Sequence, residues 1–416
     1  MNTMAVKYSF ADYLPIFLIL CFSGNPIFTS AGYSKNLLIL FSALFILYSL
    51  LYINARELTK ALKQLSLVIF IIIVLSVFQK YSLGSVSYPG VIALVLKIAL
   101  GMFLMLLYYC KDINLLDIYI KMLSFLAKVS IPFFILNYFA FVGLGMESPH
   151  QKSLLIYTSF DLPKETLRNA GMFWEPGAFA GYLILALLFI VMLNKDFILG
   201  NYKKHAFWIV IGLFTTMSTT GFLILAIFIF IYVFKNYKYG RIFVLPIIFL
   251  ISFYAYYNLD FLNAKIEEQY DEASEMEATD VSNTRFGALN MDMIYIMDQP
   301  FTGNGLDSKT RYRFHPWVDS DIGHGNGMSN FIVWWGIPFL LFWLVCVYRF
   351  AAKNSYSIIN SLLVTIIIVL VLQGEQFLNF PIFLMFFTAP AIKIAQEKHE
   401  EEEEEEEFDN EYELSV

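Results

Sequence analysis

Long apolar runs separated by short polar connections repeat along nearly the whole chain. Runs of roughly 18 residues without a charge recur, and a helix of about this length crosses the hydrocarbon core of a bilayer. The pattern therefore predicts an all-α, polytopic membrane protein with about twelve transmembrane helices. The predicted helices cover residues 11–27, 36–53, 64–79, 91–109, 129–145, 177–194, 206–218, 220–234, 242–259, 328–347, 358–378 and 380–395.

Basic residues are concentrated in alternate connections between these helices. Lysine and arginine are enriched in short cytoplasmic loops, so we expect these connections and both chain termini on the cytoplasmic side. The two longest connections on the outer side then span residues 146–176 and 260–327. The basic residues concerned are Lys7, Arg56, Lys60, Lys63, Lys111, Lys121, Lys128, Lys195, Lys203, Lys204, Lys235, Lys238, Arg241, Arg349 and Lys353.

The stretch 206–234 fits either one long helix or two short ones. A single helix would place the basic residues that flank it on opposite sides of the membrane, whereas a break at Ser218-Thr-Thr-Gly221 keeps them on one side. We therefore predict the break. Backbone that is not helical at membrane depth must be satisfied by protein or by a water-filled cavity. This turn therefore either lines a site or is an ordinary surface loop.

Composition narrows the class of protein further. Hydrophobic residues make up 58% of the 416 positions and charged residues only 15%, which excludes an ordinary soluble domain. The three cysteines, Cys21, Cys110 and Cys346, lie in apolar runs, so we expect neither disulfides nor a CxxC metal site. Residues 1–396 form the predicted transmembrane domain, and 397–416, with the glutamate run 400–407, form a disordered acidic tail. We expect no metal, no cofactor and no nucleic-acid partner.

The first polar stretch with candidate chemistry is Arg168-Asn-Ala-Gly-Met-Phe-Trp-Glu-Pro-Gly177. Its proline and glycines open a predicted helix, and a helix N-terminus favours an anion such as phosphate. Arg168 offers a planar fork for phosphate oxygens, and Trp174 offers a flat face of the kind that sugars pack against. Alternatively, Trp174 belongs to an aromatic belt at the membrane interface, and Arg168 pairs with Glu175 or a lipid headgroup.

Two further stretches follow on the same predicted side. Arg285 precedes an amphipathic segment and the turn Pro300-Phe-Thr-Gly-Asn-Gly305, which is neither a P-loop nor a dinucleotide fingerprint. His324-Gly-Asn-Gly327 opens another apolar helix, and a histidine there can exchange a proton near neutral pH. The simpler alternatives are a surface ion pair for Arg285 and a structural role for His324.

The order and spacing of these three stretches resemble the bacterial O-antigen polymerase and ligase superfamily. The residues that carry the resemblance are Arg168, Gly171, Phe173, Glu175, Pro176, Gly177, Arg285, Pro300, Gly303, Gly305, His324, Asn326, Gly336 and Ile337. They lie within roughly residues 165–345. One difference is Gly325, which separates His324 from Asn326, because the family often has the histidine and asparagine adjacent. The part played by Asn326 is therefore open.

The resemblance implies a membrane glycosyltransferase at the outer face of the bacterial cytoplasmic membrane, with a polyprenyl-pyrophosphate-linked oligosaccharide as donor. Arg168 and Arg285 would bind the pyrophosphate without a metal, because developing negative charge needs fixed cations. His324 would take the proton of the attacking sugar hydroxyl, and Glu175 is the other catalytic candidate. The implied partners are membrane lipid, a flippase and a chain-length regulator.

Three functions are to be separated: a polymerase that joins repeat units, a ligase that transfers a finished chain, and a transporter or flippase. Among weaker candidates for substrate binding, Trp174 and Asn326 belong to the stretches above, and Lys97 and Glu375 are charges within predicted helices. Lys97 either extends outward or faces a cavity. Asp319-Ser-Asp321 has a form that holds metals in other glycosyltransferases, but we expect it on the outer side, where sugar nucleotides are absent.

Overall fold

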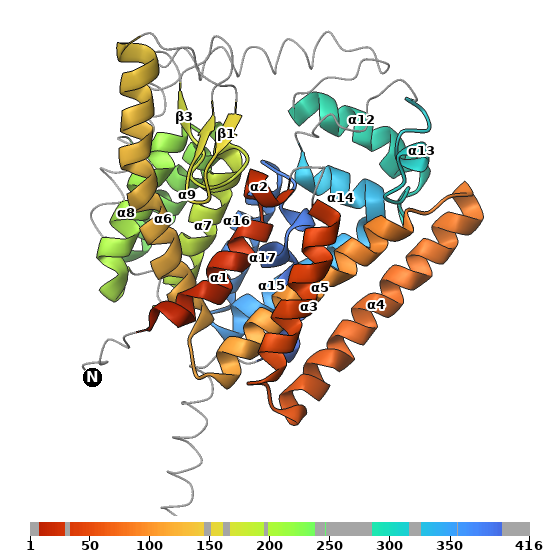
Figure 1. Ribbon diagram of the computed structural model, residues 1–416. Coiled ribbons are helices and arrows are strands. Elements are labelled where there is room, and N and C mark those ends of the chain that lie inside the picture. Colours follow the sequence, from red (N-terminus) through yellow and green to blue (C-terminus); the bar gives the residue numbers. More distant parts are fainter. Residues whose placement is uncertain are drawn as a thin grey trace, which may run out of the picture.

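The computed structural model describes residues 8–29, 34–144, 151–160, 167–194, 199–237, 246, 285–315, 326–355 and 357–392. Within these ranges the chain is mainly helical, which confirms the predicted helical class (Figure 1). Several predicted features lie outside the described residues. They are the predicted helix 242–259 with the exception of Pro246, the acidic tail, both chain termini, and the candidate residues His324, Asp319 and Asp321.

The helices keep the order expected from the apolar runs. Their bounds are α1 Phe10–Phe22, α2 Pro26–Thr29, α3 Ser34–Leu50, α4 Ala55–Leu83, α5 Tyr88–Cys110, α6 Leu115–Tyr138, α7 Pro176–Leu193, α8 Lys203–Thr216, α9 Thr219–Asn236, α12 Arg285–Asp298, α13 Ser308–Arg311, α14 Gly327–Trp335, α15 Ile337–Lys353, α16 Ile358–Leu372 and α17 Pro381–Leu384.

Five helices of the described part are long and apolar enough to cross a membrane. They are 55–83, 88–110, 115–141, 176–193 and 219–236, and three shorter apolar helices cover 10–22, 36–50 and 358–372. These lengths indicate a membrane protein. The helix α7 is buried along nearly its whole length and packs against α6, α8, α9 and α16, so it forms the centre of one half of the bundle.

The break predicted at Ser218-Thr-Thr-Gly221 is confirmed, although it begins slightly earlier in the chain. Helix α8 ends at Thr216, Met217 has a left-handed backbone with φ of 46°, and α9 begins at Thr219. The Ser218 Oγ accepts a hydrogen bond from the Gly221 N at 3.2 Å and so caps the start of α9. The two short helices therefore pack as a hairpin rather than as one span.

Two predicted helices are interrupted. The predicted helix 328–347 divides into α14 and α15 at Gly336, whose φ of 82° ends the first helix. The predicted helix 380–395 is wrong as a continuous element, because residues 381–391 form only α17 and short 3₁₀ turns. These turns lie buried in the middle of the bundle (Figure 1). Hydropathy detected their apolar character but not the broken backbone.

Side chains from neighbouring helices donate hydrogen bonds to backbone carbonyl groups of this broken segment. Gln64 Nε2 donates to the Phe387 carbonyl oxygen at 3.1 Å, and Trp343 Nε1 donates to that of Phe383 at 3.1 Å. Buried carbonyl groups outside a regular helix need such partners. The predicted first helix is likewise interrupted, at Ser23-Gly24-Asn25 between α1 and α2.

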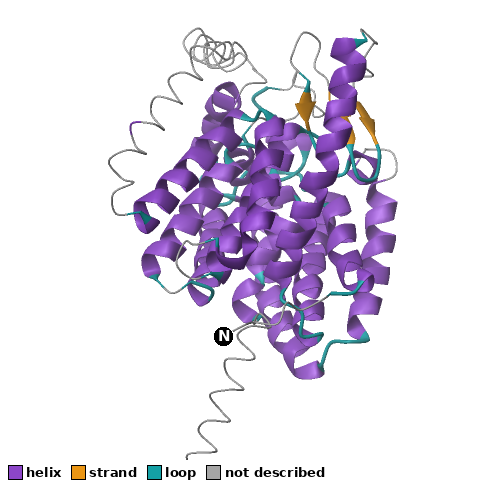
Figure 2. Ribbon diagram, turned by 90° about the vertical axis from the view of Figure 1, so that its left-hand side faces the viewer, coloured by secondary structure: helices purple, strands orange, loops and turns teal. Residues whose placement is uncertain are grey.

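The connection 146–176, which we predicted on the outer side, contains a small antiparallel sheet that hydropathy did not predict. Its strands are β1 Gln151–Ser153, β2 Thr158–Phe160 and β3 Arg168–Asn169, in the order β1-β2-β3. The sheet lies at one end of the helix bundle, on the same side as α2 and α12 (Figures 1 and 2). The chain passes directly from β3 into the turn that starts α7.

The other end of the bundle gathers residues of the connections predicted to be cytoplasmic. Asp117 accepts hydrogen bonds from the hydroxyls of Tyr8 and Tyr202, at 2.7 and 2.9 Å, and pairs with Lys121. Lys111 pairs with Asp12 and lies over the Tyr52 ring. The described parts of these connections therefore meet at one end, as their common side in the predicted topology requires.

Candidate functional site

The stretch 168–177 folds into a rigid turn that fixes the start of α7. The Asn169 side chain is buried and donates to the hydroxyls of Ser130 and Thr215 at 2.9 and 2.8 Å. Gly171 has a left-handed φ of 56°, and a Cβ there would lie 2.9 Å from the Phe179 ring. Phe173 stacks on Tyr182 with ring centroids 4.3 Å apart. Several residues of this motif thus have a packing role.

Asn25 holds this turn from the interruption between α1 and α2. Its Nδ2 donates to the carbonyl oxygens of Met172 at 2.9 Å and Leu155 at 3.1 Å. One buried amide therefore joins the N-terminal helices to the turn before α7 and to the β1–β2 connection. This role of Asn25 could not be predicted, because an isolated Asn beside a glycine is typical of any turn.

Arg168 lies on β3, next to the turn between α8 and α9. Its Nε donates to the Thr216 carbonyl oxygen at 3.2 Å. This bond connects the first candidate stretch to the Ser/Thr/Gly turn, which the sequence analysis named as a possible part of a site. A guanidinium is thereby held at the same end of the bundle as the start of α7.

Two carboxylates meet at the start of α7. Glu175 is the residue before the helix, and Gly177 is its second residue. A Cβ atom built on Gly177 would lie 2.5 Å from Glu375 Oε1 and 3.4 Å from Glu175 Oε1. Because both carboxylate oxygens lie so near the same point, the two carboxylates are close to each other. Glu375 is buried, with 7% of its surface exposed. A side chain at position 177 would therefore make the Glu375 carboxylate shift from this place.

The anion that the structure places at this helix N-terminus is therefore a side chain of the protein itself. A carboxylate at such a position is stabilised by the helix dipole, which compensates part of its burial. A second carboxylate close by is destabilising, since like charges repel.

Residues 373–380, which follow α16, connect all these parts; we call them the 373–380 segment. Gln373 Oε1 accepts a hydrogen bond from Asn326 Nδ2 at 2.9 Å. Asn326 in turn caps α14 by accepting from the Ser329 N at 3.1 Å. The next residue, Gly327, packs so closely on the Glu375 backbone that a Cβ would overlap its carbonyl oxygen. The structure thus brings Asn326 and Glu375 together with Glu175.

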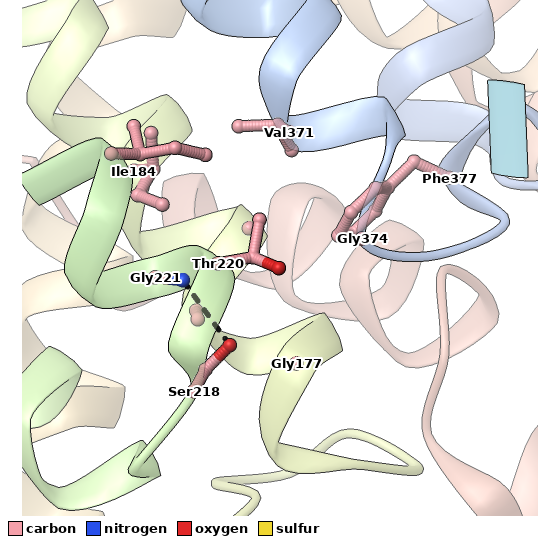
Figure 3. A pocket seen from close by; sticks show the side chains of 11 residues that line it. Gly177, Ile184, Ser218, Thr220, Gly221, Val371, Gly374 and Phe377 are labelled. Atoms are coloured by element: carbon pink, nitrogen blue, oxygen red, sulfur yellow. Dashed lines mark hydrogen bonds between the residues drawn. The ribbon is translucent and has the colours of Figure 1, made fainter. Parts of the chain in front are cut away.

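A small pocket lies beside these carboxylates, between α7, the α8–α9 turn and the end of α16. It contains about 210 Å³ of empty space, its open mouth included. Its wall includes Gly177, Gly181, Gly221 and Gly374 and the hydroxyl side chains of Ser218 and Thr220, and Thr220 projects towards Gly374 (Figure 3). Glycines leave room for a ligand to approach the backbone, and the hydroxyls can donate and accept hydrogen bonds.

Trp174 and Lys97 both contact Phe380, the last residue of the 373–380 segment. The Trp174 and Phe380 ring centroids are 4.7 Å apart, and Lys97 Nζ lies 5.8 Å from the Phe380 ring centroid. Trp174 also covers Gly24, at the interruption between α1 and α2. Both side chains are thus directed into the protein, which favours the cavity interpretation of Lys97 over extension into lipid.

The glycine-rich turn 300–305 has a structural role. A Cβ at Gly303 would lie 2.6 Å from the Trp334 backbone, and the Gly305 N donates to the Trp334 carbonyl oxygen at 3.1 Å. Gln79 on α4 donates to the carbonyl oxygens of Thr302 and Trp334, at 2.7 and 2.8 Å. The turn therefore braces the junction of α14 and α15. Arg285 begins α12, but its side chain is outside the description, and its binding role stays a prediction.

The sequence analysis missed a buried ion pair between Asp292 on α12 and Arg311 on α13. Asp292 is completely buried, and the Arg311 side chain is 2% exposed. Burial raises the pKa of the Asp292 carboxyl, and the attraction of Arg311 opposes that rise. The only available signal was one acidic residue in a mainly apolar helical segment, and this signal does not identify its partner.

Comparison of the chain with models of protein families, with curated proteins and with solved structures found no match. The structure itself defines a class: a helical protein with several helices able to span a membrane, and with a small pocket of glycines and hydroxyl side chains beside two carboxylates. In the described ranges, no three His, Cys, Asp or Glu side chains are grouped as a metal site would require.

Proposed function

We propose that this protein is a membrane glycosyltransferase that joins polyprenyl-pyrophosphate-linked oligosaccharide repeat units into a surface polysaccharide. In this proposal about twelve helices span the bacterial cytoplasmic membrane, with both termini cytoplasmic and the pocket at the outer face. The observation that supports it best is the proximity of Glu175 and Glu375 at the start of α7, with Asn326 hydrogen-bonded to Gln373, two residues before Glu375. These residues come from distant parts of the sequence, and two of them belong to the stretches that resemble the O-antigen polymerase and ligase superfamily.

The reaction in this proposal is a displacement at the anomeric carbon of the donor. An acceptor sugar hydroxyl forms the new C–O bond, and the bond to the lipid pyrophosphate breaks with its electron pair leaving on the pyrophosphate. The hydroxyl proton passes to Glu175 or His324, which act as general base. Glu375, close to Glu175, accepts hydrogen bonds from further sugar hydroxyls, as a carboxylate with several lone pairs can.

Cationic side chains stabilise the leaving group. Arg168 is held at the α8–α9 turn, and Arg285 and Lys97 are the other candidates for contact with the pyrophosphate. Fixed positive charge aimed at developing negative charge lowers the barrier most when it is preorganised. Trp174 would pack against a sugar ring, which suits its position on Phe380 near the site.

The test is the size distribution of surface polysaccharide in a strain that lacks the gene, together with the glycans left on the lipid carrier. Single repeat units without longer chains support a polymerase. Long chains that remain on the lipid carrier indicate a ligase instead, and unchanged patterns in both pools indicate a transporter.

Complementation with variants connects the activity to the site. Glu175→Gln and Glu375→Gln should fail to restore long chains, while each protein still reaches the membrane. Glu57→Gln is the matched control, because Glu57 is also a largely buried glutamate at the start of a helix but lies on α4, where it pairs with Lys60. Wild-type chain lengths from both site variants would contradict the proposal.

A further inference from the structure

Helices α12 and α13 and the turn between them cover α14; we call residues 285–315 the α12–α13 cap. The buried pair Asp292–Arg311 holds the two helices of the cap together. The Arg311 guanidinium lies 5.1 Å from the Tyr295 ring centroid and 4.9 Å from that of Tyr312. The rings limit how the guanidinium can turn, so the pair has a defined orientation.

The same two residues also form hydrogen bonds with the first turn of α14. Asp292 Oδ2 accepts a hydrogen bond from Ser329 Oγ at 2.6 Å, and Arg311 Nε donates to Asn330 Oδ1 at 3.2 Å. Both carboxylate oxygens of Asp292 are therefore used, one towards α13 and one towards α14. The ion pair fixes the start of α14 as well as the cap.

From Ser329 the contacts lead on to the candidate functional site. The Ser329 N donates to Asn326 Oδ1, and Asn326 Nδ2 donates to Gln373 Oε1. Between these two hydrogen bonds, Gly327 rests on the Glu375 carbonyl group. The series of contacts from Arg311 to Glu375 is thus made of hydrogen bonds and one tight backbone contact, with no gap between them.

Stability alone is a weak explanation for such a pair. A buried ion pair pays for its desolvation, and well-packed apolar residues of similar size often stabilise a protein as much or more. What an ion pair adds is a defined geometry, because charge-assisted hydrogen bonds have strict distances and directions. The series of contacts that begins at this ion pair reaches the backbone of Glu375.

We propose that Asp292 and Arg311 are positioning residues, which through Ser329 and Asn326 hold Gln373 and Glu375 in place at the start of α7. The physical coupling stands independently of the chemistry at the site. Its consequence for turnover rests on the proposed glycosyl transfer.

The cap provides a matched control for the experiment. Arg313 and Asp298 form a second ion pair, which joins the end of α12 to the residues after α13 and includes no residue of α14. Arg313→Met therefore removes an arginine of the same cap without removing a link to α14. Ser329→Ala is the complementary variant, because it keeps the ion pair and the Arg311–Asn330 hydrogen bond and removes only the bond from Asp292 to α14.

The test is hydrogen exchange of the full chain in lipid nanodiscs. We expect Arg311→Met and Ser329→Ala to speed exchange in peptides covering 326–330 and 373–376 by about tenfold, since local opening of these segments becomes easier. Arg313→Met should leave both peptides at the wild-type rate. Changes confined to α12 and α13, or equal changes in Arg313→Met, would overturn the proposal.

If Arg311→Met does not fold, Ser329→Ala decides, because its buried charges remain paired. Faster exchange at 373–376 in this variant supports the coupling, and a wild-type rate there refutes it. In a polymerisation assay, Ser329→Ala should lower kcat by about tenfold with little change in KM, and Ser329→Thr, which restores a hydroxyl, should recover most of it. A wild-type protein without polymerising activity would refute the proposed function and leave the exchange result standing.

Discussion

The α12–α13 cap and the start of α7 differ in how their charged side chains are arranged. In the cap, each arginine of an ion pair lies against an aspartate, as in Asp292–Arg311 and Asp298–Arg313. At the start of α7, two groups of the same sign, Glu175 and Glu375, lie close together. In the first arrangement opposite charges attract each other inside the fold, whereas in the second two like charges are held near each other at a helix start.

Glycines in the two regions differ in the same way. In the turn 300–305, a side chain at Gly303 would meet the backbone of Trp334, so the glycine allows two backbones to pack. At Gly177, a side chain would meet the carboxylate of Glu375, so the glycine allows a reactive group to reach a helix start. Glycine-rich motifs that look alike in the sequence thus differ in what they pack against, a backbone in one case and a carboxylate in the other.

The largest expected effect sharpens the functional half of this comparison. Glu175→Gln should reduce polymer formation by about 10²- to 10⁴-fold, the usual range for loss of a general base. Its thermal unfolding temperature should stay equal or rise, because a like-charge repulsion is removed. The measurements are a polymerisation assay on purified protein and a melting curve in nanodiscs. A large loss of stability would show instead that Glu175 is structural.

Removal of a buried charge tests the structural half. Arg311→Met leaves Asp292 buried without its cation and should reduce the free energy of unfolding by about 3–5 kcal/mol. Arg311→Met combined with Asp292→Leu should recover most of this loss, because no charge is then left buried. Denaturant unfolding of the purified variants measures both. An equal loss in the double variant would contradict the ion-pair explanation.

Gly327→Ala tests the contact between α14 and the 373–380 segment. Its Cβ would overlap the Glu375 backbone, so we expect a loss of about 1–3 kcal/mol, as for other overpacked positions. Gly84 is the control, because it has a left-handed φ of 80° but no neighbouring atom within 4 Å of a Cβ. Gly84→Ala should reduce stability by only about 1 kcal/mol, from backbone strain. Similar losses at both positions would contradict a steric role for Gly327.

The smallest expected effect concerns pH. The pKa of Asp307, which caps α13, is lowered chiefly by a hydrogen bond from the Ser85 hydroxyl and also by the Lys309 backbone. A lowered pKa means that the carboxylate stabilises the fold above its ordinary pKa of about 4, and that this contribution is lost as the pH falls through the lowered value. Ser85→Ala should weaken this dependence. Melting curves between about pH 2 and 6 would show it.

The sequence predicted the helices where apolar character and helical backbone coincide. The break after Thr216 was predictable, because flanking basic residues and a Ser/Thr/Gly turn both indicate it. The interruptions at Gly336 and in 381–391 were not predictable, because hydropathy measures how apolar a segment is and does not show whether its backbone is helical. The strands beside Arg168 are too short to give an alternating pattern.

The candidate site was predictable in its residue types more than in its geometry. Glu175 and Asn326 could be named from their motifs, and Glu375 from its charge in an apolar segment. Their meeting at Gly177 and Gly327 depends on contacts between distant parts of the chain, for which a single sequence holds no signal. The pair Asp292–Arg311 was missed for the same reason, because it connects two helices across a turn.

The broken segment 381–391 has a consequence for the order in which the protein assembles. It contacts α1, α4, α5 and α15, all of which are synthesised before it. Its bent backbone cannot rest in lipid by itself, since Gln64 and Trp343 provide partners for its carbonyl groups. These helices therefore cannot complete their packing around the centre of the molecule before residues 381–391 have been synthesised.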